Sequence, residues 1–171
     1  AIIKSSISPD NKELNEYVDN LIEKNKNGKY SWINQVKYIP LSGLKGLLNY
    51  KITEFNSMNI DTGIVVSKEI EDFDFSKFTT KDKDDLYTII GVYLDNAKEA
   101  SLESDSKRIS IDITYEDNNI KITIANTYKG KIDENKLDNY RYSTKGRERG
   151  IGLYLVKKIV NKNNIFKTDR I

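Results

Sequence analysis

Two neighbouring runs of the sequence alternate strictly between apolar and polar residues, and this feature most limits the possible folds. The runs cover residues 109–114 and 120–124, and residues 116–119 join them. A period of two is typical of strands with one buried face, and a short connection rich in Asp and Asn is typical of a hairpin turn. The sequence therefore predicts an antiparallel hairpin with one wet face, and other elements must cover its apolar side.

Helical periodicity identifies those other elements. Apolar residues recur at helical spacing in four segments, residues 10–27, 41–58, 80–103 and 151–160. We expect Thr80 to cap the longest helix, because acidic residues fill the turn that follows it. β-branched residues predict further strands over residues 64–70 and 164–171, and residues 30–40 have the character of a connector.

The order of these elements predicts an α+β fold. We expect a two-layer α/β sandwich with a mixed, mostly antiparallel sheet, helices on one face, and an additional N-terminal helix. A chain of 171 residues has the length of one domain or one domain with a short appendage. We place a boundary at Pro40, which separates residues 1–40 from a larger unit of residues 41–171.

The composition excludes several kinds of chemistry. With 0 Cys and 0 His, the chain can form no disulfide, thiolate metal site, Ser/His/Asp triad or phosphohistidine of its own. The 28 Lys and Arg nearly balance 26 Asp and Glu, so the overall charge of +2 does not argue for wrapping nucleic acid. No apolar run is long enough to span a membrane. With 0 Cys, a reducing, cytoplasmic compartment fits best.

Asn96 is the first candidate site residue. On a helical wheel it falls among Ile89, Tyr93 and Ala100, which predicts that its amide points inward while Lys98 lies on the opposite, exposed side. A buried amide without partners costs about 1 to 3 kcal/mol, so we expect a bonding partner. The partner is either the backbone, or a metal or phosphate ligand.

A second candidate is the glycine-rich, cationic segment of residues 143–153, which opens a helix. Free N–H groups at a helix N-terminus attract anions, and Lys145, Arg147 and Arg149 add positive charge. A flexible solvated loop, or a patch for nucleic acid, would explain the same composition. A third candidate is Asn126, which ends the second hairpin strand as a simple turn or as a ligand for the edge of a base.

Together these features resemble the ATP-binding (Bergerat) fold of the GHKL superfamily, and more closely the cytoplasmic part of AgrC-type quorum-sensing histidine kinases. Residues 91–101, GVYLDNAKEAS, are similar to the N box of that superfamily. Residues 142–146, YSTKG, and 149–153, RGIGL, are similar to the end of its lid and to its G2 box.

The resemblance implies an ATP and Mg²⁺ site. Its residues are Asn96, Asn126, Thr144, Lys145, Gly146, Arg149, Gly150, Gly152 and Leu153. By resemblance, Asn96 holds the Mg²⁺ that bridges the triphosphate, the backbone around the last two glycines cradles phosphates, and Thr144 and Lys145 close over them. Asn126 stands where the wider superfamily has an Asp that reads adenine.

Val92 stands where other members of the superfamily have Glu or a second Asn. The carboxylate that activates water is therefore missing, and we expect little ATP hydrolysis. Phosphoryl transfer to a positioned imidazole depends more on alignment and Mg²⁺ than on a base. The resemblance thus implies a kinase rather than an ATPase.

The resemblance also implies that the kinase is incomplete. Residues 11–27 resemble only the second helix of the dimerisation hairpin, and the final strand is expected after Ile171. The acceptor histidine would lie outside this chain and would pass its phosphoryl group to a response regulator. We expect a membrane-anchored, homodimeric parent, a fragment that can be monomeric, and no nucleic-acid partner. The alternative is a non-catalytic module of the same fold that binds a protein partner.

Overall fold

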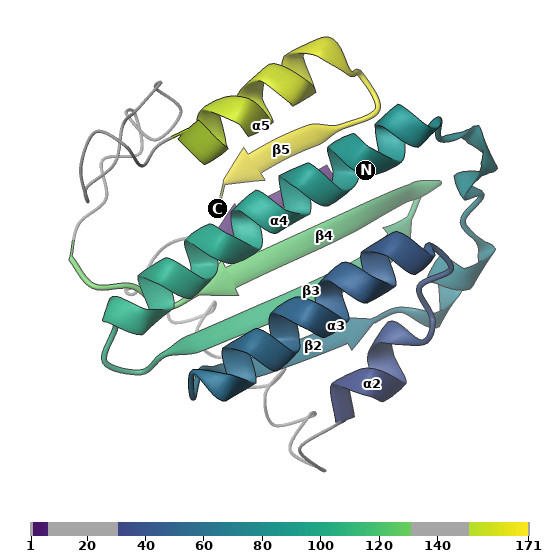
Figure 1. Ribbon diagram of the computed structural model, residues 1–171. Coiled ribbons are helices and arrows are strands. Elements are labelled where there is room, and N and C mark those ends of the chain that lie inside the picture. Colours follow the sequence, from purple (N-terminus) through teal and green to yellow (C-terminus); the bar gives the residue numbers. More distant parts are fainter. Residues whose placement is uncertain (1, 7–30, 131–150, 171) are drawn as a thin grey trace.

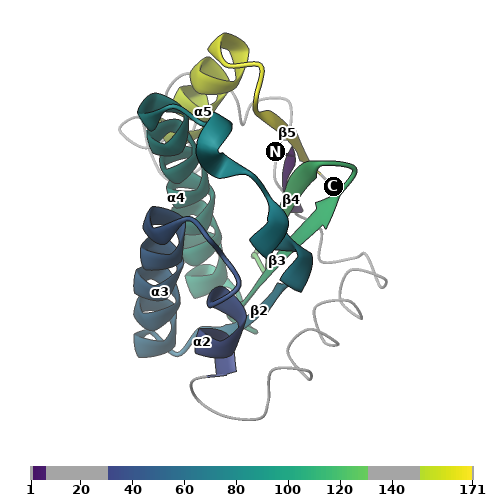
Figure 2. The same ribbon diagram turned by 90° about the vertical axis from the view of Figure 1, so that its right-hand side faces the viewer.

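A mixed sheet with helices on one face forms the body of the protein (Figures 1 and 2). The computed structural model describes residues 2–6, 31–130 and 151–170. The sheet has five strands in the order β2-β3-β4-β1-β5. Their bounds are Ile2–Ser6 for β1, Asp61–Val66 for β2, Arg108–Glu116 for β3, Asn119–Asn126 for β4 and Lys167–Arg170 for β5.

The helices are α2 (Ser31–Val36), α3 (Ser42–Ser57), α4 (Thr80–Glu103) and α5 (Ile151–Lys162), with 3₁₀ turns η1 (Lys68–Asp72) and η2 (Phe75–Lys77). Figure 2 shows α3, α4 and α5 side by side on one face of the sheet. The core lies between these two layers. It includes Ile52 and Phe55 of α3, Leu94 of α4, and Ile111 and Ile122 of the hairpin, which are at most 1% exposed.

The predicted α+β sandwich with a mixed sheet is confirmed, and one detail of the sheet differs. The pairs β1–β4, β1–β5 and β2–β3 are parallel, and only β3–β4 is antiparallel. The expectation of a mostly antiparallel sheet is wrong, because three of the four strand pairs are parallel. The sequence did not predict β1 because its residues, IIKSS, do not alternate between apolar and polar side chains.

The predicted hairpin is confirmed. Asp117 and Asn118 form its turn with φ of 50° and 59°, the left-handed conformation that a tight hairpin turn requires and that Asp and Asn tolerate. The second face of the hairpin is less exposed to solvent than predicted, since Ser110, Thr123 and Ala125 are also buried. Ser110 stands opposite Ala125 in the ladder, so short side chains pair in the middle of the sheet.

The long helices follow their predicted bounds, whereas the connections between elements differ. The cap of α4 is Thr79 instead of Thr80, because Thr79 forms a capping box with Asp82. The predicted connector contains the short helix α2. Its Gln35 side chain accepts a hydrogen bond from the backbone N–H of Val66 (3.0 Å) at the edge strand β2. That strand ends at Val66, and Ile70 lies in η1.

The predicted division at Pro40 stays a prediction, because the helix expected over residues 10–27 lies outside the described residues. Val36 and Ile39 do belong to the same core as α3. None of the helices in the described ranges combines the length and the apolar character needed to cross a membrane.

Candidate functional site

Asn96 lies in the C-terminal half of α4 and is exposed. The prediction that its amide points inward is therefore wrong. The buried stripe of α4 runs through Leu94 and Ala97, and one helical residue turns the chain by about 100°, so Asn96 falls outside the stripe. Its side chain forms no hydrogen bond within the described ranges, which leaves the amide oxygen and nitrogen available to a ligand.

The start of α5 lies against α4 one turn before Asn96. A Cβ on Gly152 would stand 3.0 Å from Cγ1 of Val92, closer than ordinary carbon contacts of about 3.5 to 4.0 Å. Glycine at position 152 therefore allows the two helices to approach closely. Because residues four apart share a helix face, Asn96 is on the side of α4 that faces α5, next to the first turn of that helix.

The first turn of α5 presents backbone donors at the same place. Its first four N–H groups have no acceptor within the helix, and they carry the positive end of the helix dipole. Ile151 is 48% exposed, whereas Leu153 is half-buried and packs against the core. An anion near Ile151 would therefore meet N–H groups on one side and α4 on the other.

Asn126 closes β4, and a network of hydroxyl groups ties this end of the strand to α4. Thr127 Oγ1 bonds with Ser104 Oγ (2.7 Å) and accepts from the backbone N–H of Arg108 (2.9 Å). Ser101 Oγ, which is fully buried, donates to the Arg108 carbonyl (3.0 Å). The network fixes the C-terminal end of α4 to β3 and to the residue after Asn126.

Asn126 itself is half-buried, and its Nδ2 donates to the Thr127 carbonyl (2.9 Å). The amide nitrogen of Asn126 is therefore used within the turn after β4, and a simple turn was one of the two alternatives that the sequence left open for this residue. Its carbonyl oxygen is the group that remains to accept from a ligand.

Four charged side chains join α3 to α4 beside Asn96. Lys51 Nζ donates to Asp95 (2.5 Å), and Lys98 Nζ donates to Glu54 (2.9 Å). Both pairs are 44 residues apart, so the helices run parallel in a fixed register. The Lys98 side chain is only 18% exposed, so the prediction of an exposed Lys98 is wrong.

The cluster keeps Lys98 charged. Burial by itself would lower the pKa of Lys98, but the hydrogen bond to Glu54 and the charges of Asp95 and Glu54 raise it above its ordinary value of 10.5. Both carboxylates are thus engaged with lysines, and Lys51 also lies 3.7 Å from Glu54. The role of this cluster is to hold the register of α4, on which the place of Asn96 depends.

Five of the predicted site residues lie outside the described residues: Thr144, Lys145, Gly146, Arg149 and Gly150. The remaining four lie on α4, β4 and α5. Figure 1 shows the end of β4 and the first turn of α5 on the same side of the molecule, with the C-terminal half of α4 beside them. The hydroxyl network and the charge cluster were not predicted. Of their residues, only Ser101 could have been noticed in the sequence, because it is a polar residue on the apolar stripe of α4, four positions after Ala97.

The described residues suit a polyanion with its own metal ion better than a protein metal centre. Within the described ranges no group of three His, Cys, Asp or Glu residues could hold a metal. Mg²⁺ commonly takes one protein ligand, substrate phosphates and water, and it prefers oxygen. The amide oxygen of Asn96 could serve as the protein ligand of such an ion, and the N–H groups of α5 could bind the phosphate oxygens.

Comparison with known families agrees with this arrangement. The family model of the GHKL domain matches residues 82–168, from the first turn of α4 into β5 and just over half of the chain. The chain therefore belongs to the GHKL domain family, and this membership supports ATP binding as its general activity. No curated protein matches the chain.

Proposed function

We propose that the chain is the catalytic and ATP-binding part of an AgrC-type sensor histidine kinase. It binds Mg²⁺-ATP and transfers the γ-phosphoryl group to a histidine outside this chain. The contact between Val92 and Gly152 carries the proposal, because it sets the exposed amide of Asn96 beside the N-terminus of α5. Membership of the GHKL family supports the nucleotide, and the N box and G2 box strings support the kinase branch.

Each side chain has a separate task in this proposal. When bound, Mg²⁺-ATP supplies the phosphoryl group and the cation that neutralises its charge. Asn96 would orient the cation, the N–H groups of α5 would hold phosphate oxygens, and the Asn126 carbonyl would accept from the base. Val92 is used for packing against Gly152, so this position offers no base to activate water.

The partners follow from the same proposal. The acceptor histidine belongs to a helix of the parent kinase, because this chain has 0 His. A response regulator then takes the phosphoryl group from that histidine. We place the domain in the cytoplasm, in a parent that is a membrane-anchored homodimer.

A second candidate is a non-catalytic GHKL-fold module that binds a protein partner. Asn126 favours it, because its donor is engaged with Thr127 and it replaces the Asp that reads adenine elsewhere in the superfamily. Val92 favours it too, because no carboxylate stands four residues before Asn96.

Calorimetric titration with a non-hydrolysable ATP analogue, with and without Mg²⁺, tests the nucleotide site. We expect Mg²⁺-dependent binding, and a roughly tenfold or greater loss in Asn96→Ala, since a hydrogen bond or ligand to a charged group contributes about 1.5 to 3 kcal/mol. Asn56→Ala is the matched control, an exposed helical Asn on α3. Binding to Asn96→Ala with wild-type affinity and Mg²⁺ dependence would contradict the site.

The stability of the two variants separates a lost ligand from a damaged fold. Ala is more favourable than Asn in a helix by up to about 0.7 kcal/mol, so both variants should be as stable as wild type or slightly more stable. A loss of affinity in Asn96→Ala at unchanged stability therefore reports on the site.

Transfer assays with labelled ATP distinguish the kinase from the binding module. We expect negligible hydrolysis by the chain alone, and phosphorylation of an added helix that carries the acceptor histidine. Robust hydrolysis without that helix would contradict the argument from Val92. Binding of ATP without transfer to the helix would favour the non-catalytic module.

A further inference from the structure

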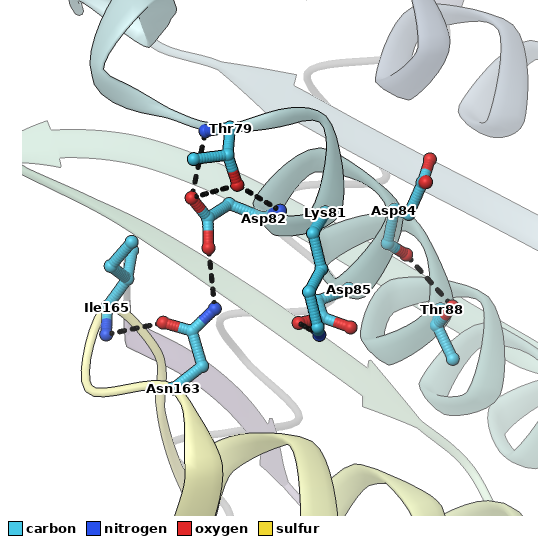
Figure 3. A network of polar contacts seen from close by, with 8 residues as sticks. All are labelled: Thr79, Lys81, Asp82, Asp84, Asp85, Thr88, Asn163 and Ile165. Atoms are coloured by element: carbon cyan, nitrogen blue, oxygen red, sulfur yellow. Dashed lines mark hydrogen bonds and ion pairs between the residues drawn. The ribbon is translucent and has the colours of Figure 1, made fainter.

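The far end of α5, remote from the nucleotide site, is joined to the start of α4 by side chains (Figure 3). The capping box of α4 uses one carboxylate oxygen of Asp82, which accepts from the backbone N–H (2.8 Å) and hydroxyl (2.7 Å) of Thr79. The other oxygen accepts from Nδ2 of Asn163 (2.7 Å), just beyond the last residue of α5. A capping box joins only the N-cap residue and the N3 residue, here Thr79 and Asp82, so the bond to Asn163 is an additional, tertiary link.

Asn163 is held firmly enough to act as an anchor. Its Oδ1 accepts from the backbone N–H of Ile165 (3.1 Å), and its own backbone N–H donates to the Ile159 carbonyl (2.9 Å). Its amide nitrogen is thereby aimed at Asp82, which is 9% exposed. Because one partner is ionised, this hydrogen bond is of the stronger, charge-assisted kind.

The two helices are antiparallel and meet at two defined points. Asp82 meets Asn163 at one end, and Val92 meets Gly152 at the other. Ten residues on α4 correspond to eleven on α5, so the register is maintained over about 15 Å. The second point is next to Asn96, and the first is about 21 Å from it along α4.

α5 is held less firmly by the core than α3 is. Among its described side chains only Val156 is fully buried, and Leu153, Ile159 and Val160 pack against the core while partly exposed, whereas α3 buries five side chains. A helix with few buried contacts opens or shifts at low free-energy cost. Its position is therefore sensitive to a hydrogen bond at its end.

We propose that Asn163 is a positioning residue for the nucleotide site: by binding Asp82 it sets where the first turn of α5 lies relative to Asn96. The inference rests on the proposed nucleotide-binding function. It assigns no contact between Asn163 and the nucleotide. Loss of the anchor would let α5 tilt about its contact with Val92, and a displacement of about 1 Å at a site can change a rate by about a hundredfold.

The variant Asn163→Asp tests this inference, because it places a second carboxylate beside Asp82. At about pH 8 both carboxylates are ionised and repel each other, whereas at about pH 5 the pair can share one proton and restore a hydrogen bond. The charged residues within five positions of Asp82 or Asn163 in the sequence are Lys77, Lys81, Lys83, Asp84, Asp85, Lys158, Lys162 and Lys167. Lys81 pairs with Asp85 (2.6 Å), and its charge also favours the ionised form of Asp82.

We expect Asn163→Asp to bind the Mg²⁺-ATP analogue roughly tenfold more weakly than wild type at about pH 8 and to approach wild-type affinity at about pH 5. Asn164→Asp is the matched control, because it adds the same charge at the next, exposed residue. It should follow wild type at both pH values. Equal affinities of Asn163→Asp and wild type at about pH 8 would overturn the inference.

A second readout reports the position of α5 without nucleotide. The chain has 0 Cys, so spin labels can be attached through cysteines introduced at Leu155 on α5 and Asn56 on α3, which are both exposed. The distance distribution should shift or broaden in Asn163→Asp at about pH 8 and return at about pH 5. An unchanged distribution would overturn the inference even if affinity falls. A wild-type chain that binds no nucleotide would refute the proposed function instead.

Discussion

The contact between Gly152 and Val92 can be tested by adding a single methyl group. In Gly152→Ala the new Cβ would stand 3.0 Å from Cγ1 of Val92, so α5 or Val92 must move by a few tenths of an ångström. Extra volume in a packed interface costs about 1 to 3 kcal/mol. Replacing Gly by Ala in a compatible backbone gains about 0.4 to 1 kcal/mol, because the unfolded chain loses freedom. The difference between the middles of these ranges is about 1 kcal/mol, and we therefore expect Gly152→Ala to destabilise the wild-type chain by about that amount.

The same substitution should have the opposite sign in a Val92→Ala background. Val92→Ala removes both γ-methyl groups, and the remaining Cβ lies 3.9 Å from the new one, an ordinary contact. Only the gain of about 0.4 to 1 kcal/mol then remains. The difference between the two backgrounds is the coupling energy of a double-mutant cycle.

Urea denaturation followed by circular dichroism measures all four variants. Slopes for small proteins are about 1 to 3 kcal/mol per molar urea, so a change of about 1 kcal/mol moves the midpoint by roughly 0.3 to 1 M. A substitution that stabilises both backgrounds equally would show that α5 does not approach α4 at Val92. The argument that places Asn96 beside α5 would then fail.

Three further predictions concern the N-terminus and one side of α4. Because the pKa of Lys98 is raised in the folded state, the stabilisation by its charge is complete below pH 10.5 and is lost as the pH rises through the folded-state pKa. Urea denaturation should therefore show that wild type is more stable than Lys98→Met, and that this difference shrinks at alkaline pH. Thr79→Ala should lower the free energy of unfolding by about 1 kcal/mol through loss of the cap, and Thr79→Ser should restore most of it. The hydrogen bonds from Thr79 also lower the pKa of Asp82 below its ordinary value of 3.8. Wild type should therefore lose more stability than Thr79→Ala as the pH falls below about 4. An equal loss of stability in both proteins would contradict this linkage.

Much of the fold could be predicted because it depends on local patterns. The hairpin has a period of two and a turn formed by Asp117 and Asn118, and both features depend only on residues that are close together in the sequence. The long helices have their own periodicity and a cap near Thr79. The position of β1 could not be predicted, because it depends on pairing with strands more than a hundred residues away.

The predicted site residues stay a prediction, whereas the inward orientation predicted for Asn96 is wrong. Asn96 stands at the margin of the buried stripe, and which margin is covered depends on where α3 and α5 lie. Lys98 was expected to be exposed because a helical wheel describes a single helix. The wheel does not include Glu54 of α3, to which Lys98 donates a hydrogen bond. The close packing at Gly152 could not be predicted from the sequence, because its contact, Val92, belongs to another helix.

The central claim is that a nucleotide is held between Asn96 and the first turn of α5. Nuclear magnetic resonance titration of the ¹⁵N-labelled chain with a Mg²⁺-ATP analogue tests it most directly. The account predicts the largest shifts at the side-chain amide of Asn96 and at the backbone amides of residues 151–154, with little change at the amide of Asn56. Shifts concentrated elsewhere, with those signals unmoved at saturation, would contradict it.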